Sequence, residues 1–83
     1  MAVKSYVLIE TEVGTAKAVG DRLKDVHHKD ANVVQVDTVT GPFDVIAQIE
    51  ADDLNKLGSC ITEAIQTITG VKRTTTCLTL VLD

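Results

Sequence analysis

Residues 33–51 read VVQVDTVTGPFDVIAQIEA, so two runs of strand-forming residues lie on either side of a Gly-Pro pair. Valine and isoleucine favour strands, whereas Gly41 and Pro42 favour a turn, because glycine permits unusual backbone angles and proline fixes its own φ. In the second run, apolar residues recur at every second position, which is the period of a strand. The sequence therefore predicts two antiparallel strands, 33–40 and 44–51, joined by a tight turn.

The chain before this hairpin predicts a strand followed by a helix. Residues 3–10 are rich in Val, Tyr, Leu and Ile, and residues 11–14 form a turn that ends in glycine. Thr15 is a residue type that caps helices, and the helix after it is expected to run to about Val26. The apolar stripe of this helix consists of Ala16, Val19, Leu23 and Val26.

The chain after the hairpin predicts a second helix and a last strand. Asp52 or Asp53 is expected to cap the helix, which runs to about Ile68, and Gly70 is a natural stop after it. Residues 71–82 alternate in the manner of a strand. The apolar face of the second helix consists of Leu54, Leu57, Ile61, Ala64, Ile65 and Ile68.

The predicted order of elements is strand, helix, strand, strand, helix, strand, in a single domain over residues 1–83. Two right-handed crossovers in this order place both helices on one face of a four-stranded antiparallel sheet. The sequence therefore predicts an α+β protein of the ferredoxin-like βαββαβ class.

The first and last predicted strands carry apolar side chains on both faces. Tyr6 and Leu8 fall on one face of the first strand, and Val7 and Ile9 fall on the other. Because the helices cover only one face of the sheet, a second copy of the chain is the simplest partner to cover the other face. We therefore expect an obligate homodimer that packs sheet against sheet.

The composition disfavours several classes of partner. The net charge is −4, and the eight lysines and arginines are too scattered to follow a phosphate backbone, so direct nucleic-acid binding is not expected. No apolar run approaches the roughly 20 residues of a membrane span. The chain starts directly in a strand pattern, so no targeting segment is expected. Cys60 and Cys77 are expected to be buried, reduced thiols of a cytoplasmic protein.

The turn at residues 40–44, Thr-Gly-Pro-Phe-Asp, is the first candidate site. Gly41 and Pro42 make the turn rigid, and its free backbone amides could hold a carboxylate. Asp44 could hold an ammonium group, so the turn offers complements to both charged ends of an amino acid. The alternative is an ordinary hairpin turn in which Asp44 accepts hydrogen bonds from local amides.

The last strand provides a second candidate, because Thr74 and Thr76 share a face and would present two hydroxyls. A run of threonines is also common in strands that have no binding function. His27 and His28 are adjacent, so their rings point apart, and a solvated helix end is favoured over a metal site. No nucleophile with a partner base and no phosphate-binding loop is present. We therefore expect no catalytic residues, no metal and no cofactor.

The turn T-G-P-F-D and the later stretch G-V-K-R-T-T-T, residues 70–76, resemble the effector-binding (RAM) domain of the Lrp/AsnC transcription regulators. The likeness extends over nearly the whole chain. It implies βαββαβ protomers that pair sheet to sheet as dimers, and dimers that close into rings, often octamers. It also implies that small effectors, typically amino acids, bind between dimers near the hairpin turn and the threonine-bearing strand. The matching positions are Gly41, Pro42, Phe43, Asp44, Thr74 and Thr76.

The sequence also departs from this family pattern. Full-length members carry an N-terminal helix-turn-helix domain, which this sequence lacks, so it is expected to act by binding an effector or by mixing with full-length regulators. Phe43 stands where tyrosine is common, so no hydroxyl is available there.

Three functions remain open from the sequence. The leading one is a non-enzymatic regulatory module that binds a small effector at an oligomer interface. The second is a dimeric ferredoxin-like enzyme, a monooxygenase or isomerase of small hydrophobic substrates, in which only His27, His28 and Tyr6 could serve. The third is a purely structural oligomerisation module.

Overall fold

The computed structural model describes residues 2–80. Its elements are, in chain order, β1 (Val3–Thr11), α1 (Ala16–Lys24), β2 (Ala31–Thr38), β3 (Val45–Ala51), α2 (Leu54–Cys60), the π-helical turn η1 (Ile61–Ile65) and β4 (Val71–Leu78). Because η1 directly continues α2, the two form one helical segment. The order confirms the predicted βαββαβ arrangement.

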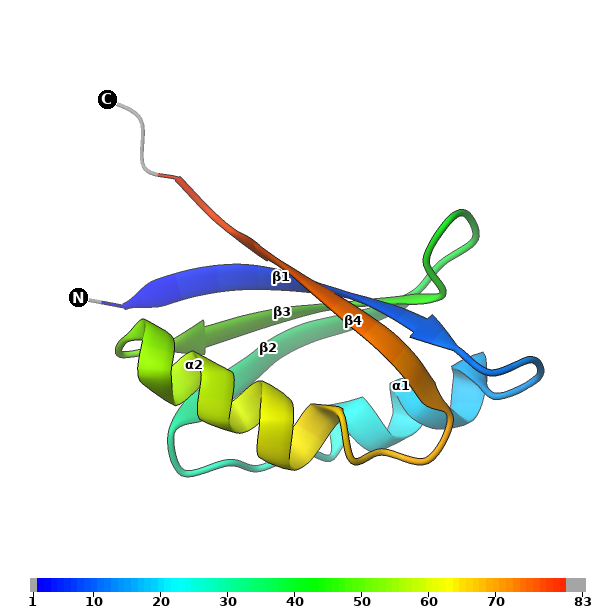
Figure 1. The fold of residues 1–83 in the computed structure, drawn as a ribbon, viewed down its shortest axis with the longest axis horizontal. Helices are drawn as coiled ribbons and strands as arrows, with labels where there is room; N and C mark the ends of the chain where they lie inside the picture. The colour runs from blue at the N-terminus through cyan, green and yellow to red at the C-terminus, as the bar shows by residue number, and fades with distance from the viewer. Residues whose placement is uncertain (1, 81–83) are drawn as a thin grey trace.

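The strands form one antiparallel sheet in the order β2-β3-β1-β4, and both helices lie on one of its faces (Figure 1). This confirms the ferredoxin-like fold. β1 is central because it pairs with β3 on one side and with β4 on the other. No helix within residues 2–80 is long and apolar enough to cross a bilayer.

The core lies between the sheet and the helices. Alternate residues of β1 and β3 point into it, whereas their neighbours face the helix-free side. The sheet contributes Val7, Ile9, Val45, Ala47, Ile49 and Ala51, and the helical side contributes Val19, Leu23, Leu57, Cys60, Ile61, Ile65 and Ile68. Ser5 is buried with them, and its hydroxyl donates to the Ile49 carbonyl oxygen at 3.0 Å. The predicted division of β1 into two faces is therefore confirmed.

Thr15 precedes α1 but does not cap it through its side chain. Its backbone lies at φ −110° and ψ 0°, outside the extended region that directs a capping hydroxyl at the helix amides. The hydroxyl instead donates to the Glu12 carbonyl oxygen at 2.7 Å, and it also lies 3.4 Å from the carbonyl oxygen of Gly70. Thr15 thus ties the turn before α1 to the turn before β4.

The second helix begins as predicted and then departs from α-helical geometry. The carboxylate of Asp53 accepts the Lys56 amide at 2.8 Å, which confirms Asp53 as the cap. The α-helix ends at Cys60, and the bond from the Gln66 amide to the Ile61 carbonyl oxygen, 2.8 Å, belongs to the π-helical turn. Leu54 is 57% exposed, so its predicted place on the buried face is wrong. It lies in the first turn of the helix, before the segment that packs on the sheet.

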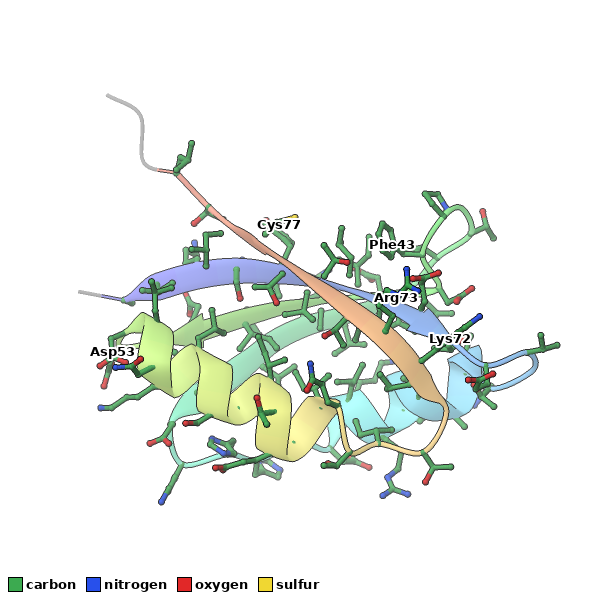
Figure 2. All side chains as sticks on the ribbon, viewed as in Figure 1. Phe43, Asp53, Lys72, Arg73 and Cys77 are labelled. Carbon is green, nitrogen blue, oxygen red and sulfur yellow. The ribbon has the colours of Figure 1, made fainter. Side chains whose placement is uncertain are left out.

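The two cysteines have different environments. Cys60 is buried, and burial raises the pKa of its thiol, with a smaller contribution from the negative charges of Asp30 and Glu63. Cys77 is exposed, so its predicted burial is wrong. It pairs with Tyr6 and therefore faces the side of the sheet that no helix covers (Figure 2).

Candidate functional site

Residues 39–44 connect β2 to β3 and rise from the sheet on the side away from the helices (Figure 1). The base of this loop is closed by the Val39 amide, which donates to the Asp44 carbonyl oxygen at 2.9 Å. Gly41 has a φ of 141°, which L-residues rarely adopt, although a Cβ there would meet nothing within 4 Å. Backbone conformation, and not lack of space, therefore makes glycine necessary at this position.

Asp44 links the hairpin loop to β1. Its Oδ2 accepts the Thr11 amide at 2.8 Å, and its own amide donates to the Ile9 carbonyl oxygen at 2.9 Å. The first bond lies at the point where the register of β1 against β4 shifts, between Glu10 and Thr11. The carboxylate therefore satisfies an amide that is distant in sequence, and Oδ1 makes no hydrogen bond with residues 2–80.

A pair of opposite charges lies beside Asp44 and was not identified from the sequence. Glu10 pairs with Arg73 across β1 and β4, and the Arg73 Nε lies 3.6 Å from the Glu10 Oε2. Asp44 directly precedes Val45, the partner of Ile9, so both charges occupy the end of the sheet that carries the loop. Figure 2 places Phe43 and Arg73 at this end. Only the strand register reveals the cluster, because its members are far apart in sequence.

Thr74 and Thr76 lie on the opposite face of the sheet. Thr74 pairs with Ile9 and Thr76 pairs with Val7, both core residues, so the two hydroxyls face the helix side. The Gln66 Nε2 donates to the Thr74 hydroxyl at 3.1 Å. Because α1 and α2 pack mainly over β2 and β3, the helix-side face of β4 stays largely uncovered.

The predicted site residues therefore form two groups within one chain. Residues 41–44 lie in the loop on the helix-free side, whereas Thr74 and Thr76 face the helix side. A site that uses both groups needs a second copy of the chain. Chemically, the two groups offer main-chain amides, a carboxylate oxygen and hydroxyls, which together suit a small zwitterion.

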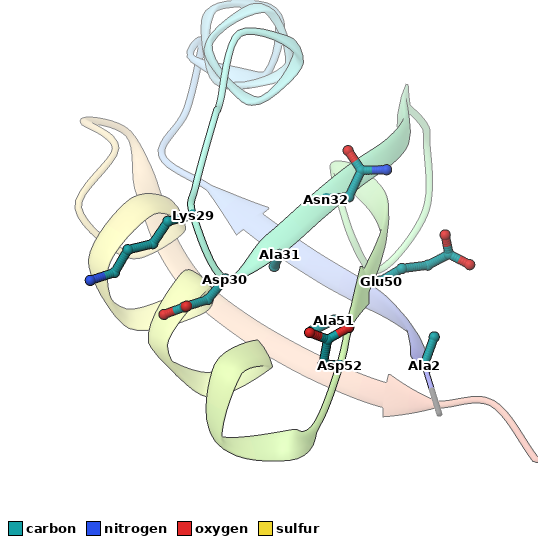
Figure 3. Close-up of a pocket in the computed structure, with 8 residues that line it drawn as sticks. All are labelled: Ala2, Lys29, Asp30, Ala31, Asn32, Glu50, Ala51 and Asp52. Carbon is teal, nitrogen blue, oxygen red and sulfur yellow. The ribbon is translucent and has the colours of Figure 1, made fainter.

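A depression lies at the other end of the sheet, where β3 ends and β2 begins (Figure 3). It has a volume of about 390 Å³ and is lined by Ala2, Lys29, Asp30, Ala31, Asn32, Glu50, Ala51 and Asp52. None of the predicted site residues borders it. Within residues 2–80, no group of three His, Cys, Asp or Glu side chains is placed to hold a metal ion.

The histidines have structural surroundings. The ring of His28 is only 10% exposed, and its Nδ1 accepts the Asp30 amide at 3.1 Å, which makes Nε2 the donor to the Glu63 carboxylate at 2.9 Å. The prediction that His28 lies in solvent at the end of a helix is therefore wrong, because the loop after α1 folds back onto η1. Tyr6 lies on the helix-free face, over a smaller depression of about 190 Å³. None of these side chains faces the closed cavity that the enzymatic alternative requires.

The family model of the Lrp/AsnC ligand binding domain matches residues 4–81. The chain belongs to this family. The matched stretch includes the hairpin loop, the threonines of β4 and the strands that position them. The resemblance inferred from T-G-P-F-D and G-V-K-R-T-T-T is thus confirmed.

Solved structures share the fold of this Lrp/AsnC ligand-binding domain. TTHA0845 from Thermus thermophilus is 28% identical with a TM-score of 0.84, and the match covers 98% of this chain and 96% of that one. AsnC of E. coli is 17% identical with a TM-score of 0.84, over 96% of this chain and 52% of that one. Regulator NMB0573 of Neisseria meningitidis, solved with L-Met, is 14% identical with a TM-score of 0.79, over 94% and 49%.

The Lrp/AsnC ligand-binding domain described here therefore spans about half the length of the AsnC and NMB0573 chains, and nearly all of TTHA0845. At such low identities, the likeness to AsnC and NMB0573 concerns the fold alone. None of the curated proteins compared with the chain matches it.

Proposed function

We propose that this Lrp/AsnC ligand-binding domain is a non-enzymatic regulatory module that binds an amino acid at an interface between copies of the chain. The observation that carries the proposal is the arrangement of the two site groups. The hairpin loop with Gly41 and Asp44 lies on one side of the sheet, and the hydroxyls of Thr74 and Thr76 lie on the other. Each group is incomplete alone, so the effector is the element that joins them across a subunit boundary.

The polar groups match the two charged ends of an amino acid. The Asp44 carboxylate uses only Oδ2 for the Thr11 amide, so Oδ1 remains available for the ligand's ammonium group. The amides around Gly41 and the threonine hydroxyls are suited to its carboxylate. Charged ends left unpaired on burial would cost several kcal/mol, so both must be satisfied. The L-Met held by NMB0573 is a ligand of this chemical class, and it supports the proposal.

The side chain of the ligand is expected to be apolar and small to medium in size. Valine, isoleucine and leucine are the main aliphatic residues of the strands that border the site, and tryptophan is absent from the chain. A wall of this kind contacts aliphatic groups without offering hydrogen bonds. We therefore expect the branched-chain amino acids and methionine to be the first ligands to test.

The assembly in this proposal begins with a dimer. Tyr6, Leu8 and Ile46 share the helix-free face, where no part of residues 2–80 covers them. A second copy packed on this face would bury them, and further dimers would join into a ring that creates the effector sites.

The proposed biological role is regulation without direct DNA contact. A net charge of −4 gives the chain no electrostatic attraction to DNA, so an effect on transcription would pass through mixed assembly with full-length family regulators. We place this role in the cytoplasm, where both thiols stay reduced.

A thermal-shift screen of the twenty common L-amino acids tests the proposal, with each amino acid compared with its amide and its D-enantiomer. A ligand at 100 times its Kd adds about 2.7 kcal/mol to the free energy of unfolding. We expect one or a few apolar L-amino acids to raise the Tm and their amides to have no effect. If no amino acid raises the Tm, the proposal is wrong.

A further inference from the structure

His28 lies in the loop between α1 and β2, where its ring packs against η1. The ring is largely buried, whereas the neighbouring His27 is exposed. The proposed amino-acid site uses neither this ring nor the groups that bind it. Histidine is the side chain whose charge changes near neutral pH, so a buried ring with two hydrogen-bonded nitrogens is a place where pH can act on the fold.

The hydrogen bonds of the His28 ring define its protonation state. A backbone N–H can only donate, so the Asp30 amide, 3.1 Å from Nδ1, requires an Nδ1 without a proton. The proton of the neutral ring is therefore on Nε2, which donates to the Glu63 carboxylate at 2.9 Å. The two bonds are satisfied together only when the ring is neutral and has this tautomer.

Protonation of His28 would act on the two bonds in opposite directions. A proton on Nδ1 would face the Asp30 N–H, so the acceptor would be lost and two donors would oppose each other. The bond from Nε2 to Glu63 would become a charge-assisted pair and would be strengthened. The ring would therefore stay on η1 while the Asp30 amide is released.

Residues 28–31 form the turn that leads into β2, and this turn depends on the ring. Its main-chain bond, from the Ala31 amide to the His28 carbonyl oxygen, has a length of 3.4 Å, which is longer than an ordinary N–H···O bond. The bond to Nδ1 is shorter and fixes the residue between them. Lys29 and Asp30 also border the depression at the start of β2 (Figure 3). Opening of the turn would therefore alter the rim of this depression.

We propose that His28 is a pH-sensitive latch: protonation of its ring releases the Asp30 amide and opens the turn of residues 28–31, while the bond to Glu63 holds the ring in place. Histidine side chains change charge between about pH 5 and 8, so the turn is closed at the upper end of this range and open at the lower end. The inference rests on the hydrogen bonds of the ring and does not depend on amino-acid binding.

The charged groups around the ring come from its own turn, from η1 and from α2. Glu63 of η1 binds the ring directly, and Asp30 lies on the same turn. On α2, burial raises the pKa of the Cys60 thiol, and the negative charges of Asp30 and Glu63 raise it further, so both acids lie near this thiol. Lys56 of α2 is bound to Asp52, which raises the pKa of its ammonium group, with a smaller contribution from Asp30. A charged imidazole would thus lie beside acidic groups, and the cation of α2 has its own partner.

A scalar coupling across the hydrogen bond, measured by NMR on the ¹⁵N-labelled protein, tests the latch directly. At about pH 8 we expect a coupling between the Asp30 amide nitrogen and the His28 Nδ1, with the ring proton on Nε2. At about pH 5 we expect the coupling to vanish. The protection of the Asp30 amide, corrected for the intrinsic effect of pH on exchange, should then fall about fivefold, as loss of one hydrogen bond implies. A coupling that is absent at the higher pH, or a ring that stays neutral at the lower pH, would overturn the inference.

Two variants show whether His28 is the group that responds. In His28→Asn, the side-chain oxygen can accept the amide two residues further on, as asparagine does in turns, and it does not titrate. His27→Asn makes the same change at the exposed neighbouring position and is the matched control. We expect the pH response of the Asp30 and Ala31 amides to disappear in His28→Asn and to persist in His27→Asn. A response that persists in His28→Asn, or that disappears in His27→Asn, contradicts the latch. If His28→Asn does not fold, as judged by circular dichroism, the coupling in the wild type decides the question.

Discussion

At the scale of single residues, Asp44 combines a structural bond with a free carboxylate oxygen. Oδ2 holds the Thr11 amide at 2.8 Å, where the register of β1 shifts, and Oδ1 makes no hydrogen bond with residues 2–80. The sequence offered two interpretations of Asp44, as a ligand for an ammonium group or as an acceptor for local amides. In the structure, Asp44 accepts a hydrogen bond from a distant amide through Oδ2. Oδ1 is therefore still available to bind an ammonium group.

Two substitutions at Asp44 separate these roles. Asp44→Asn keeps an acceptor for the Thr11 amide and removes the charge, whereas Asp44→Ala removes both. Because the bond involves a charged, half-buried acceptor, we expect Asp44→Ala to lower the free energy of unfolding by about 1.5–3 kcal/mol. Asp44→Asn should remain close to the wild type in stability and lose effector binding. Urea unfolding and the thermal shift measure the two effects, and an Asp44→Asn protein that binds normally would limit Asp44 to its structural role.

At the scale of elements, periodicity predicted the four strands and two helices, because core-facing residues recur at intervals of two in strands and about 3.6 in helices. It missed the π-helical turn at residues 61–65, since the buried isoleucines there fit an α-helical stripe as well. β2 begins at Ala31, two residues before the predicted start at Val33, because an edge strand tolerates polar residues on its open sides.

The candidate site could likewise be predicted from the sequence only in part. The turn residues Gly41 and Asp44 were identified from local chemistry, and their positions agree with a rigid hairpin loop. Glu10 and Arg73 were missed because only the pairing of β1 with β4 brings them together. Periodicity placed Thr74 and Thr76 on the same face of the strand. It could not show whether that face lies on the helix side of the sheet or on the side that carries the loop.

Substitution of Gly70 tests the close contact between the turn before β4 and the start of α1. Its φ is 102°, and a Cβ would lie 2.8 Å from the Thr15 hydroxyl and 3.0 Å from the Val19 Cγ2. Gly70→Ala therefore adds backbone strain and a steric clash, and we expect it to lower the free energy of unfolding by about 1–3 kcal/mol. Gly58 in α2 is the control, because a Cβ there meets nothing within 4 Å and alanine favours the helix by roughly 0.8–1 kcal/mol. Urea unfolding at fixed protein concentration should give opposite signs for the two variants, and equal effects would contradict this account.

At the scale of the whole molecule, the helix-free face is expected to bind a second copy. Leu8 lies at the centre of this face, between Ile46 and Thr75, so Leu8→Asp would place an unpaired charge in the contact. Val13 is fully exposed in the turn after β1, and Val13→Asp is the matched control. We expect sedimentation equilibrium to give a lower mass for Leu8→Asp and the wild-type mass for Val13→Asp, with both variants folded. A Leu8→Asp protein of unchanged mass would place the dimer contact elsewhere.

The separation of the loop from Thr74 and Thr76 by the thickness of the sheet has a thermodynamic consequence. If one effector contacts both groups, it binds the assembled state and not the isolated chain, so ligand binding and association are linked reciprocally. The apparent Kd for the effector would then fall as the protein concentration rises, and the ligand would tighten the association by the same factor. Such a module responds to the product of two quantities, the abundance of its metabolite and its own abundance. A cell could therefore change the threshold of the response through expression level alone, without any change in the residues that contact the ligand.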